Sequence, residues 1–277
     1  MAANRRPEIL SEEQVAFFDR EGFLHLKGFL DKDQIEEIKD HFLTLLPEVP
    51  ASSIDPLIKE EKDEKDPLTA FPRILYAERL SEFAKGYLTH PDIMDVMADI
   101  FKEEALGAAL MYYFKPPGAR GQALHQDNYY LRIEPGTCVG FWMAIDPSDE
   151  ENGGLVVVPN TGREDIQCPH QGDKTLFAYT DEVDLPEGTS PVPVNMEAGD
   201  VLIFNGNIIH GSYPNRSKDR FRRSLIGHYI GFSSERTGHH ISELLYDRHG
   251  NVHIRGANKH SGPCGTIWNE ETETVAP

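Results

Sequence analysis

The sequence predicts a mainly β protein with flanking α-helices, built around a double-sheet jelly roll. Between residues 108 and 232, short strand-like runs are separated by Pro-Gly, Asn-Gly and Gly-Asp turns, which is typical of two packed sheets of short strands. Upstream of them, apolar residues recur at helical spacing. The chain has 277 residues, of which 39% are hydrophobic and 26% charged, as in a single globular domain. We therefore expect a double-stranded β-helix core of the cupin-like kind.

The helices are predicted near the N-terminus. Ser11-Glu-Glu-Gln14 is a capping box that begins a helix ending near Arg20, and Asp31 caps a second helix with an apolar face. A third helix is expected over residues 91–101. Residues 47–72 are rich in proline and charge with little periodicity, so we expect a long loop near the barrel mouth, and whether this loop closes as a lid stays open.

We expect one domain over residues 1–277. Residues 1–107 would form a mostly helical buttress, 108–232 the jelly-roll core and 233–277 a C-terminal tail. The histidines of this tail fit no tetrahedral metal pattern, so we expect a tail that lies on the surface or covers the active site. They are His239, His240, His249, His253 and His260.

The charge and the termini restrict the partners. A net charge of −19 argues against nucleic acid, because phosphate binding needs a basic footprint. No apolar run approaches the ~20 residues of a membrane span, and the N-terminus lacks the apolar stretch of a secretory signal, so we expect a cytoplasmic protein. Three cysteines at scattered spacings indicate free thiols rather than a disulfide framework, which suits a reducing compartment. Nothing in the sequence predicts the oligomeric state.

His125-Gln126-Asp127, together with the more distant His210, predicts an iron site. Two histidines and one carboxylate on one face leave open coordination positions, which is the signature of non-haem Fe(II) oxygenases. Because strand side chains alternate between faces, His125 and Asp127 would point the same way. His210 would complete the site from another strand.

Arg222 begins a run that reads as a strand, and an arginine buried there needs an anion. Its planar guanidinium suits a carboxylate, and 2-oxoglutarate carries a distal carboxylate that must be held while its keto-acid end chelates iron. Ser212 lies on the predicted face of His210, where its hydroxyl would add a hydrogen bond. Lys115 and Gln122 precede the metal strand closely enough to contact co-substrate or substrate.

In these motifs the chain resembles the phytanoyl-CoA dioxygenase family of Fe(II)/2-oxoglutarate oxygenases, from Leu10 to about Phe232. Each motif is modest alone, and their common order and spacing carry the resemblance. The motifs are Gln14-Val-Ala-Phe-Phe-Asp-Arg-Glu-Gly-Phe-Leu-His-Leu26, Lys115-Pro-Pro-Gly118, Leu124-His125-Gln-Asp127, Trp142-Met-Ala-Ile-Asp146, Glu151-Asn-Gly153, Gly199-Asp-Val-Leu-Ile-Phe204, His210-Gly-Ser212 and Arg222.

The resemblance implies roles for single residues. His125, Asp127 and His210 match the metal ligands, and Arg222 matches the arginine that binds the C5 carboxylate of 2-oxoglutarate. Arg220 and Arg223 compete for that role, but Arg222 keeps the family's offset to the downstream histidine. Trp142 matches a tryptophan near the co-substrate, and Ser212 a serine beside the arginine. The chain departs from the family in the Pro159-Asn-Thr-Gly162 loop, which puts substrate contacts from that loop in doubt.

The expected chemistry couples decarboxylation of 2-oxoglutarate, giving succinate and CO2, to the oxidation by O2 of a C–H bond in a small molecule or natural-product intermediate. Hydroxylation is the default outcome, and desaturation or another oxidation stays open. A CoA thioester is disfavoured as substrate because its phosphates need a basic patch. Two alternatives stay open: a jelly-roll metalloprotein that works without 2-oxoglutarate, as an isomerase or cofactor-independent dioxygenase, and a non-catalytic binding module.

Two further groups of residues are tempting candidates. Four tyrosines flank the predicted metal strand and either line a substrate pocket or belong to the core, the commoner fate of aromatic residues in strands. They are Tyr112, Tyr113, Tyr129 and Tyr130. His228 shares the predicted face of Arg222, and we expect a core histidine there rather than a fourth ligand, since the triad is already complete.

Overall fold

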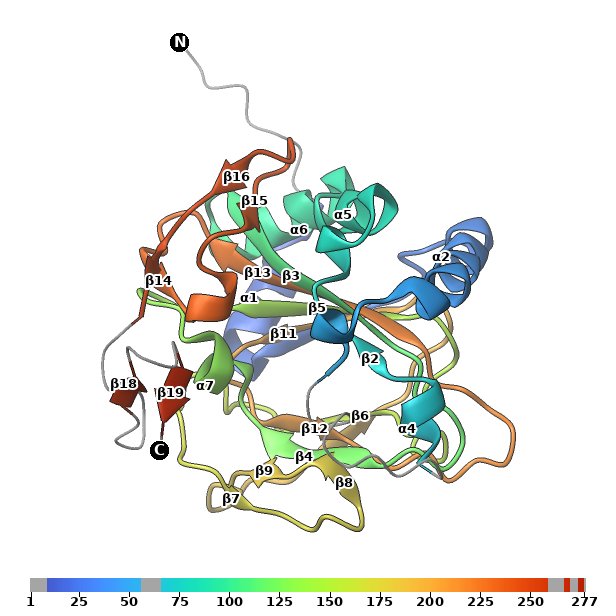
Figure 1. Cartoon of the computed structure of the whole chain (residues 1–277). Coiled ribbons are helices and arrows are strands. Elements are labelled where there is room, and N and C mark those ends of the chain that lie inside the picture. The colour runs from blue at the N-terminus through green and yellow to red at the C-terminus, as the bar shows by residue number, and fades with distance from the viewer. Residues whose placement is uncertain (1–8, 56–65, 259–266, 270–273, 277) are drawn as a thin grey trace.

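Two β-sheets that pack against each other form the centre of the molecule (Figure 1). We describe the protein from a computed structural model, in which residues 9–55, 66–258, 267–269 and 274–276 are placed. The architecture confirms the predicted mainly β fold with flanking helices. None of the described helices is long and apolar enough to cross a bilayer.

The larger sheet has eight strands, in the order β1-β11-β5-β13-β3-β15-β16, with β2 also paired to β3. All of its strand pairs are antiparallel. The bounds are β1 Phe23–Leu26, β2 Arg73–Ile74, β3 Ala105–Tyr113, β5 Val139–Ala144, β11 Val201–Asn205, β13 Ser224–Gly231, β15 Leu245–Tyr246 and β16 Val252–His253.

The smaller sheet has five strands, in the order β10-β6-β12-β4-β8, and lies below the larger one in Figure 1. Its bounds are β4 Gly121–His125, β6 Leu155–Val157, β8 Phe177–Tyr179, β10 Val192–Val194 and β12 His210–Ser212. Three two-stranded ribbons complete the strands of the described chain: β7 (His170–Gln171) with β9 (Asp181–Glu182), β14 (Arg236–Thr237) with β17 (Gly256–Ala257), and β18 (Ile267–Asn269) with β19 (Thr274–Ala276).

Helices cover the outer face of the larger sheet (Figure 1). The helices are α1 Glu12–Glu21, α2 Lys32–Leu45, α4 Pro67–Ala70, α5 Glu82–Leu88, α6 Pro91–Phe101 and α7 Asp127–Leu131, with 3-10 turns at Leu46–Glu48, Ala51–Ser53, Ala77–Arg79 and His239–Ile241. The predicted capping box at Ser11 and the predicted cap at Asp31 both form: each side chain accepts a hydrogen bond from the backbone three residues on, and the structure shows that Asp31 belongs to a capping box as well. These caps fix where α1 and α2 begin.

Successive side chains of β5 alternate between the two faces of the larger sheet, and each face contributes to a different hydrophobic core. Phe141 and Met143 pack with the helices, whereas Trp142 and Ala144 point between the sheets. The layer between the sheets is the place where side chains from both can meet, and the candidate site lies there.

The structure differs from two predictions, one about the cysteines and one about residues 47–72. Cys168 is disulfide-bonded, so the expectation of three free thiols is wrong, and the argument from free thiols for a reducing compartment no longer holds. Cys138 is a buried free thiol. Part of the predicted loop over residues 47–72 forms short helical turns, β2 follows directly after it, and its segment 56–65 lies outside the described residues.

Candidate active site

Two histidines face each other across neighbouring strands of the smaller sheet. β4 ends at His125, β12 begins at His210, and the two residues are paired in register. Their ring centroids are 4.2 Å apart. His210 therefore reaches His125 from a distant strand, as we expected, because β12 pairs with β4.

Asp127 does not continue the strand of His125, so that part of the prediction is wrong. Asp127 is the first residue of α7, and Gln126 is its N-cap. The chain leaves the strand because the Gln126 amide donates to the carbonyl of Asn207 at 2.8 Å, and the Asn128 backbone N–H donates to Gly206, also at 2.8 Å. These partners are far away in sequence, so local alternation could not reveal them.

The Asp127 carboxylate nevertheless reaches both histidines. Its Oδ1 lies 3.3 Å from Nε2 of His125 and 3.7 Å from Nε2 of His210. One ligand atom of each residue lies within 4.8 Å of the other two, an arrangement that could hold a metal ion. The three predicted ligands therefore come together, although from a strand end, a helix start and a second strand.

The hydrogen bonds of the two histidines fit a metal site. A backbone carbonyl only accepts, so Nδ1 of His125 donates to Ala123 at 2.9 Å, and Nδ1 of His210 donates to Ile208 at 3.1 Å. In both neutral rings the lone pair is then on Nε2, which faces Asp127. Histidine ligands commonly have their second nitrogen fixed by a carbonyl in this way.

The surroundings of the cluster favour a neutral imidazole at His210 and an ionised carboxylate at Asp127. Burial, followed by the charge of His125, lowers the pKa of His210 to about 4. Burial alone would raise the pKa of Asp127, but the facing imidazoles of His210 and His228 hold it well below its usual value. Metal ligands must be deprotonated, and this cluster meets that requirement at neutral pH.

We expect the metal-free protein to lose stability as the pH falls from 6.5, the ordinary pKa of histidine, to about 4, the pKa of folded His210. In this window the unfolded chain binds a proton at His210 and the folded chain does not, so stability rises with pH by up to about 3 kcal/mol from this group. Denaturant unfolding in the presence of a chelator measures the effect. His210→Gln should show a flatter pH profile, and an equally steep profile in that variant would contradict the assignment.

Arg222 lies two residues before β13 and is only 2% exposed. Its Nε donates to the carbonyl of Gly153 at 3.1 Å and its Nη1 to Oγ of Ser224 at 2.8 Å. Within the described part of the chain its Nη2 forms no hydrogen bond and the guanidinium no ion pair with a carboxylate. Burial, followed by the charge of Arg73, lowers the pKa of Arg222 to about 9, which leaves it protonated at neutral pH.

The neighbouring arginines both have carboxylate partners. Arg220 pairs with Asp149 and Glu151, each at 2.7 Å. Arg223 donates to both oxygens of Asp146, at 2.7 and 2.8 Å. Of the three arginines considered from the sequence, Arg222 alone has no anion among the residues that the structure places, which agrees with the choice of Arg222.

Two further buried cations lie close to Arg222. Lys115 is 5% exposed and donates from Nζ to Oγ of Ser212 at 2.8 Å. Burial, then the charges of Arg222 and Arg73, hold the pKa of Lys115 well below its usual value. Arg73 is also buried, with its guanidinium carbon 3.5 Å from the ring centroid of Tyr179. Arg222 therefore lies close to a second buried guanidinium and to a buried lysine amine, groups that suit an anion site.

Gln122 and Trp142 complete the set of residues predicted from the sequence. Gln122 accepts a hydrogen bond from Arg73 at 3.0 Å, which orients its amide nitrogen toward Nε2 of His125 at 2.7 Å. The ring of Trp142 lies 5.2 Å from the guanidinium carbon of Arg222. A cavity of about 60 Å³ between the sheets is lined by both residues, by Ser212 and Arg222, and by the three candidate metal ligands.

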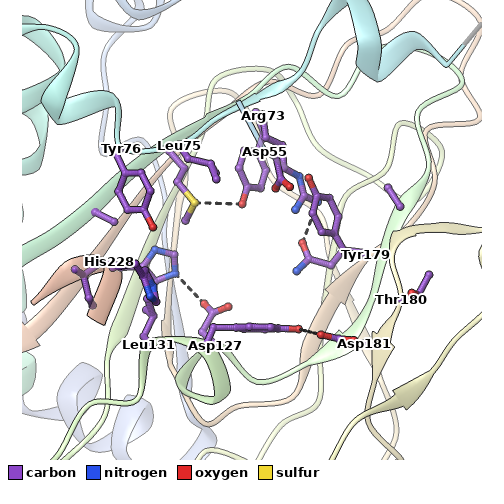
Figure 2. A pocket seen from close by; sticks show the side chains of 18 of the residues that line it. Asp55, Arg73, Leu75, Tyr76, Asp127, Leu131, Tyr179, Thr180, Asp181 and His228 are labelled. Atoms are coloured by element: carbon purple, nitrogen blue, oxygen red, sulfur yellow. Dashed lines mark hydrogen bonds and ion pairs between the residues drawn. The ribbon is translucent and has the colours of Figure 1, made fainter. Parts of the chain in front are cut away.

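A larger cavity of about 700 Å³ adjoins the smaller one, and Arg73, Gln122, Asp127 and His228 line both. Figure 2 shows Asp127 and His228 on one side of it and Arg73 and Tyr179 on the opposite side. Tyr113 and Tyr130 line it as well, whereas Tyr112 is stacked on Phe42 in the core. Tyr129 contacts Tyr130 edge to face and is not among the lining residues.

Sequence reasoning missed several lining residues of the larger cavity. Arg73 follows an unremarkable loop, and Tyr179 comes from β8, a short strand without a motif. Five polar or charged lining residues absent from the predicted set are Asp55, Arg73, Tyr76, Tyr179 and Asp181. His240 from the C-terminal tail also lines the cavity, so at this point the tail covers the active site. His228, which we expected in the core, donates to Asp127. Its position on the same predicted strand face as Arg222 was the sequence feature that could have indicated a place near the site.

Comparison with known proteins identifies the family. The sequence model of phytanoyl-CoA dioxygenase (PhyH) matches residues 18–224, which is most of the chain. The chain belongs to the phytanoyl-CoA dioxygenase family. Among curated relatives, a probable phytanoyl-CoA dioxygenase of Caenorhabditis elegans is 27% identical over 245 residues, covering 81% of this chain and 77% of that one. Phytanoyl-CoA dioxygenase 1 of Oryza sativa is 25% identical over 246 residues, covering 75% and 85%.

Solved structures show the same fold at low sequence identity. EctD from S. alaskensis in its apoform has a TM-score of 0.65 at 20% identity, covering 82% of this chain and 79% of that one. The epimerase SnoN, solved with Fe3+, alpha ketoglutarate and nogalamycin RO, has a TM-score of 0.63 at 20% identity, covering 81% and 84%. The family assignment confirms the predicted class: the chain is a 2-oxoglutarate-dependent dioxygenase with Fe(II), 2-oxoglutarate and O2 as its requirements.

Proposed function

We propose that this enzyme hydroxylates a C–H bond of a small, polar molecule, and that Fe(II) binds to His125, Asp127 and His210 while 2-oxoglutarate is anchored by Arg222. The observation that carries the proposal is Arg222 itself. It is a buried, protonated guanidinium without an anion among the described residues, in the same cavity as the three ligands. A buried charge of this kind is costly unless an anion neutralises it.

The surrounding residues support a carboxylate at Arg222. Gly153 and Ser224 accept from Nε and Nη1, which fixes the plane of the guanidinium and leaves Nη2 for a ligand. Lys115 and Ser212 form a second donor pair nearby, and the Trp142 ring packs beside the guanidinium. We assign the C5 carboxylate to Arg222, with Lys115 and Ser212 as auxiliary donors and Trp142 as a packing surface.

Gln122 has a separate role in the proposal. Its amide donates to the Nε2 lone pair of His125, the pair that a metal ion requires. If a metal ion occupied that nitrogen, the Gln122 amide would lose this acceptor and would be an available donor beside the metal site. Arg73 keeps the amide in this orientation, because it donates to the Gln122 carbonyl oxygen. We assign Gln122 to the co-substrate or substrate on the metal.

When bound, Fe(II) with 2-oxoglutarate and O2 supplies the oxidant for C–H cleavage. The chain itself supplies a triad on one face, which leaves three positions open, two for the keto-acid and one for O2. It also places the larger cavity against Asp127 and Gln122, so a molecule held there has its reacting carbon next to the metal site. Burial between the two sheets keeps bulk water from the oxidant.

The larger cavity supports a small, polar substrate. Its volume of about 700 Å³ is within the ordinary range for small-molecule sites. Its charged lining mixes acids with bases, namely Asp55, Asp127 and Asp181 with Arg73 and Lys174. The diphosphate of a CoA thioester needs a cluster of basic groups, which this lining does not offer. The structure of SnoN, an epimerase from nogalamycin biosynthesis, contains nogalamycin RO, which supports a natural-product intermediate as another class of small-molecule substrate.

We expect anaerobic addition of Fe(II) and then 2-oxoglutarate to the metal-free protein to produce the weak visible charge-transfer band of the keto-acid chelate. The band reports chelation at the metal, so it tests the triad and Arg222 together without knowledge of the substrate. It should be absent in His125→Ala and should require much higher 2-oxoglutarate concentrations in Arg222→Ala.

Tight metal binding without any band would overturn the co-substrate assignment and favour a metalloprotein that works without 2-oxoglutarate. A failure to bind Fe(II), Mn(II) or Co(II) would favour a non-catalytic binding module. Substrate candidates are then screened by their perturbation of the band, and the product by the mass increase of one oxygen atom that hydroxylation requires.

A further inference from the structure

His228 is a buried histidine that contacts the candidate metal site without being one of its three ligands. It lies on β13 in the larger sheet and is 4% exposed. Its Nε2 lies 2.9 Å from Oδ2 of Asp127, the bond drawn in Figure 2. Asp127 is the first residue of α7, two residues after the end of β4, so this contact links the larger sheet to the segment that follows β4 of the smaller sheet.

The direction of this hydrogen bond follows from its partner. An ionised carboxylate only accepts, so the proton is on Nε2 of His228. Nδ1 of the ring is buried and has no hydrogen-bond partner among the residues that the structure places. The contact with Asp127 is therefore the one polar interaction that holds the ring in the described structure.

The two oxygens of Asp127 face different groups. Oδ1 points toward the metal-facing nitrogens of His125 and His210, at 3.3 and 3.7 Å. Oδ2 is occupied by His228. A carboxylate held in this way offers one oxygen to a metal ion, whereas a free carboxylate is able to turn and offer both.

The strand around His228 accommodates the imidazole. Its direct neighbours across the sheet are Ala109 on β3 and Gly140 on β5, both small. The register of β13 with β3 shifts between His228 and Tyr229. Such irregularities re-aim side chains and are common next to active sites.

We propose that His228 is a positioning residue that keeps Asp127 a one-oxygen ligand. The inference rests on the proposed function, because the reaction needs three open positions on the metal. If Asp127 bound through both oxygens, the triad would supply four donor atoms and leave two positions, too few for the keto-acid and O2 together. His228 thus preserves the position that O2 needs.

A matched pair of variants tests the hydrogen bond apart from the bulk of the ring. His228→Gln keeps an N–H donor, and His228→Met has a similar size and flexibility without one. The probe is Co(II), titrated into the metal-free full-length protein and followed by its visible ligand-field absorption. We expect His228→Met to weaken Co(II) binding by about 10- to 100-fold and to change the absorption bands, and His228→Gln to restore most of both. The control is Tyr229→Phe. It removes a hydroxyl from the adjacent buried residue, and this hydroxyl has no hydrogen-bond partner among the placed residues.

Equal Co(II) affinities and equal spectra for the Gln and Met variants would overturn the proposal. A second measurement uses the wild-type protein and so does not depend on the folding of either variant. In the Zn(II)-loaded wild-type protein, the Nε2–H proton of His228, assigned by its through-space contacts to Ala109 and Gly140 on the neighbouring strands, should persist in the NMR spectrum. Its disappearance on metal loading would make His228 a ligand instead. If 2-oxoglutarate leaves the Co(II) spectrum of the wild type unchanged, the proposed function fails, while the Gln and Met comparison still decides the role of His228.

Discussion

Asp127→Ala is expected to lower Fe(II) affinity by more than about a hundredfold and to abolish turnover. Replacing groups that merely support metal ligands already costs 10- to 100-fold, so losing a ligand should cost more. Asp127 is the only carboxylate of the cluster, and its charge offsets the metal ion in a buried site. Its removal also leaves His228 without the acceptor of its Nε2–H bond.

Metal titration by calorimetry, with single-turnover assays of 2-oxoglutarate decarboxylation, measures the Asp127→Ala effect. Glu36→Ala is the matched control, because it removes an exposed carboxylate from α2, far from the cluster in the fold. We expect wild-type affinity in the control. Near wild-type Fe(II) affinity in Asp127→Ala would remove this residue from the metal site.

Arg222→Met is expected to raise the dissociation constant of 2-oxoglutarate by at least about 30-fold while leaving Fe(II) binding intact. Truncating one partner of a buried, hydrogen-bonded charge pair costs about 2–5 kcal/mol, and every 1.4 kcal/mol is about tenfold in affinity. Arg222→Lys should recover part of the loss, since a lysine keeps the charge but not the planar pair of donors.

The neighbouring Arg223 provides the control for Arg222. Arg223→Met removes an equal charge one residue away, from a guanidinium that already binds both oxygens of Asp146. We expect this variant to lose folding stability and to keep its 2-oxoglutarate affinity, as followed by the charge-transfer band. Equal losses of 2-oxoglutarate affinity in the two variants would show a general electrostatic effect, and would argue against a specific anchor at Arg222.

The features that sequence reasoning predicted best are those fixed by nearby residues. The capping boxes at Ser11 and Asp31 are made by side chains three residues away, so they locate α1 and α2 without knowledge of the fold. The short-strand pattern predicted two packed sheets, because alternation reflects burial on a sheet face. The choice of Arg222 over its neighbours came from motif spacing, and the carboxylate partners of Arg220 and Arg223 agree with it.

The features that could not be predicted depend on contacts between distant segments. Asp127 begins a helix because Gln126 and Asn128 bond to the backbone around residue 206, a contact with no local signal. Arg73 reaches the site only because β2 pairs with the end of β3. The same applies to Tyr179, which the parallel pairing of β8 with β4 brings to the cavity. Motifs therefore predicted the candidate groups for metal and co-substrate, and the tertiary fold adds the groups that line the larger cavity.

Two of the candidate metal ligands lie on one sheet and Arg222 lies beside the other. This placement would limit the length of the oxoacid that can reach both sites. His125 and His210 belong to the smaller sheet, whereas Arg222 leads into β13 of the larger one. The spacing between stacked sheets, about 10 Å in general, then sets how far apart the two ends of a bridging dicarboxylate must be. If Arg222 anchors the co-substrate as proposed, we expect an oxoacid one carbon shorter or longer to leave either the metal or the guanidinium without its partner. Selectivity for chain length would then be a property of the packing between the sheets.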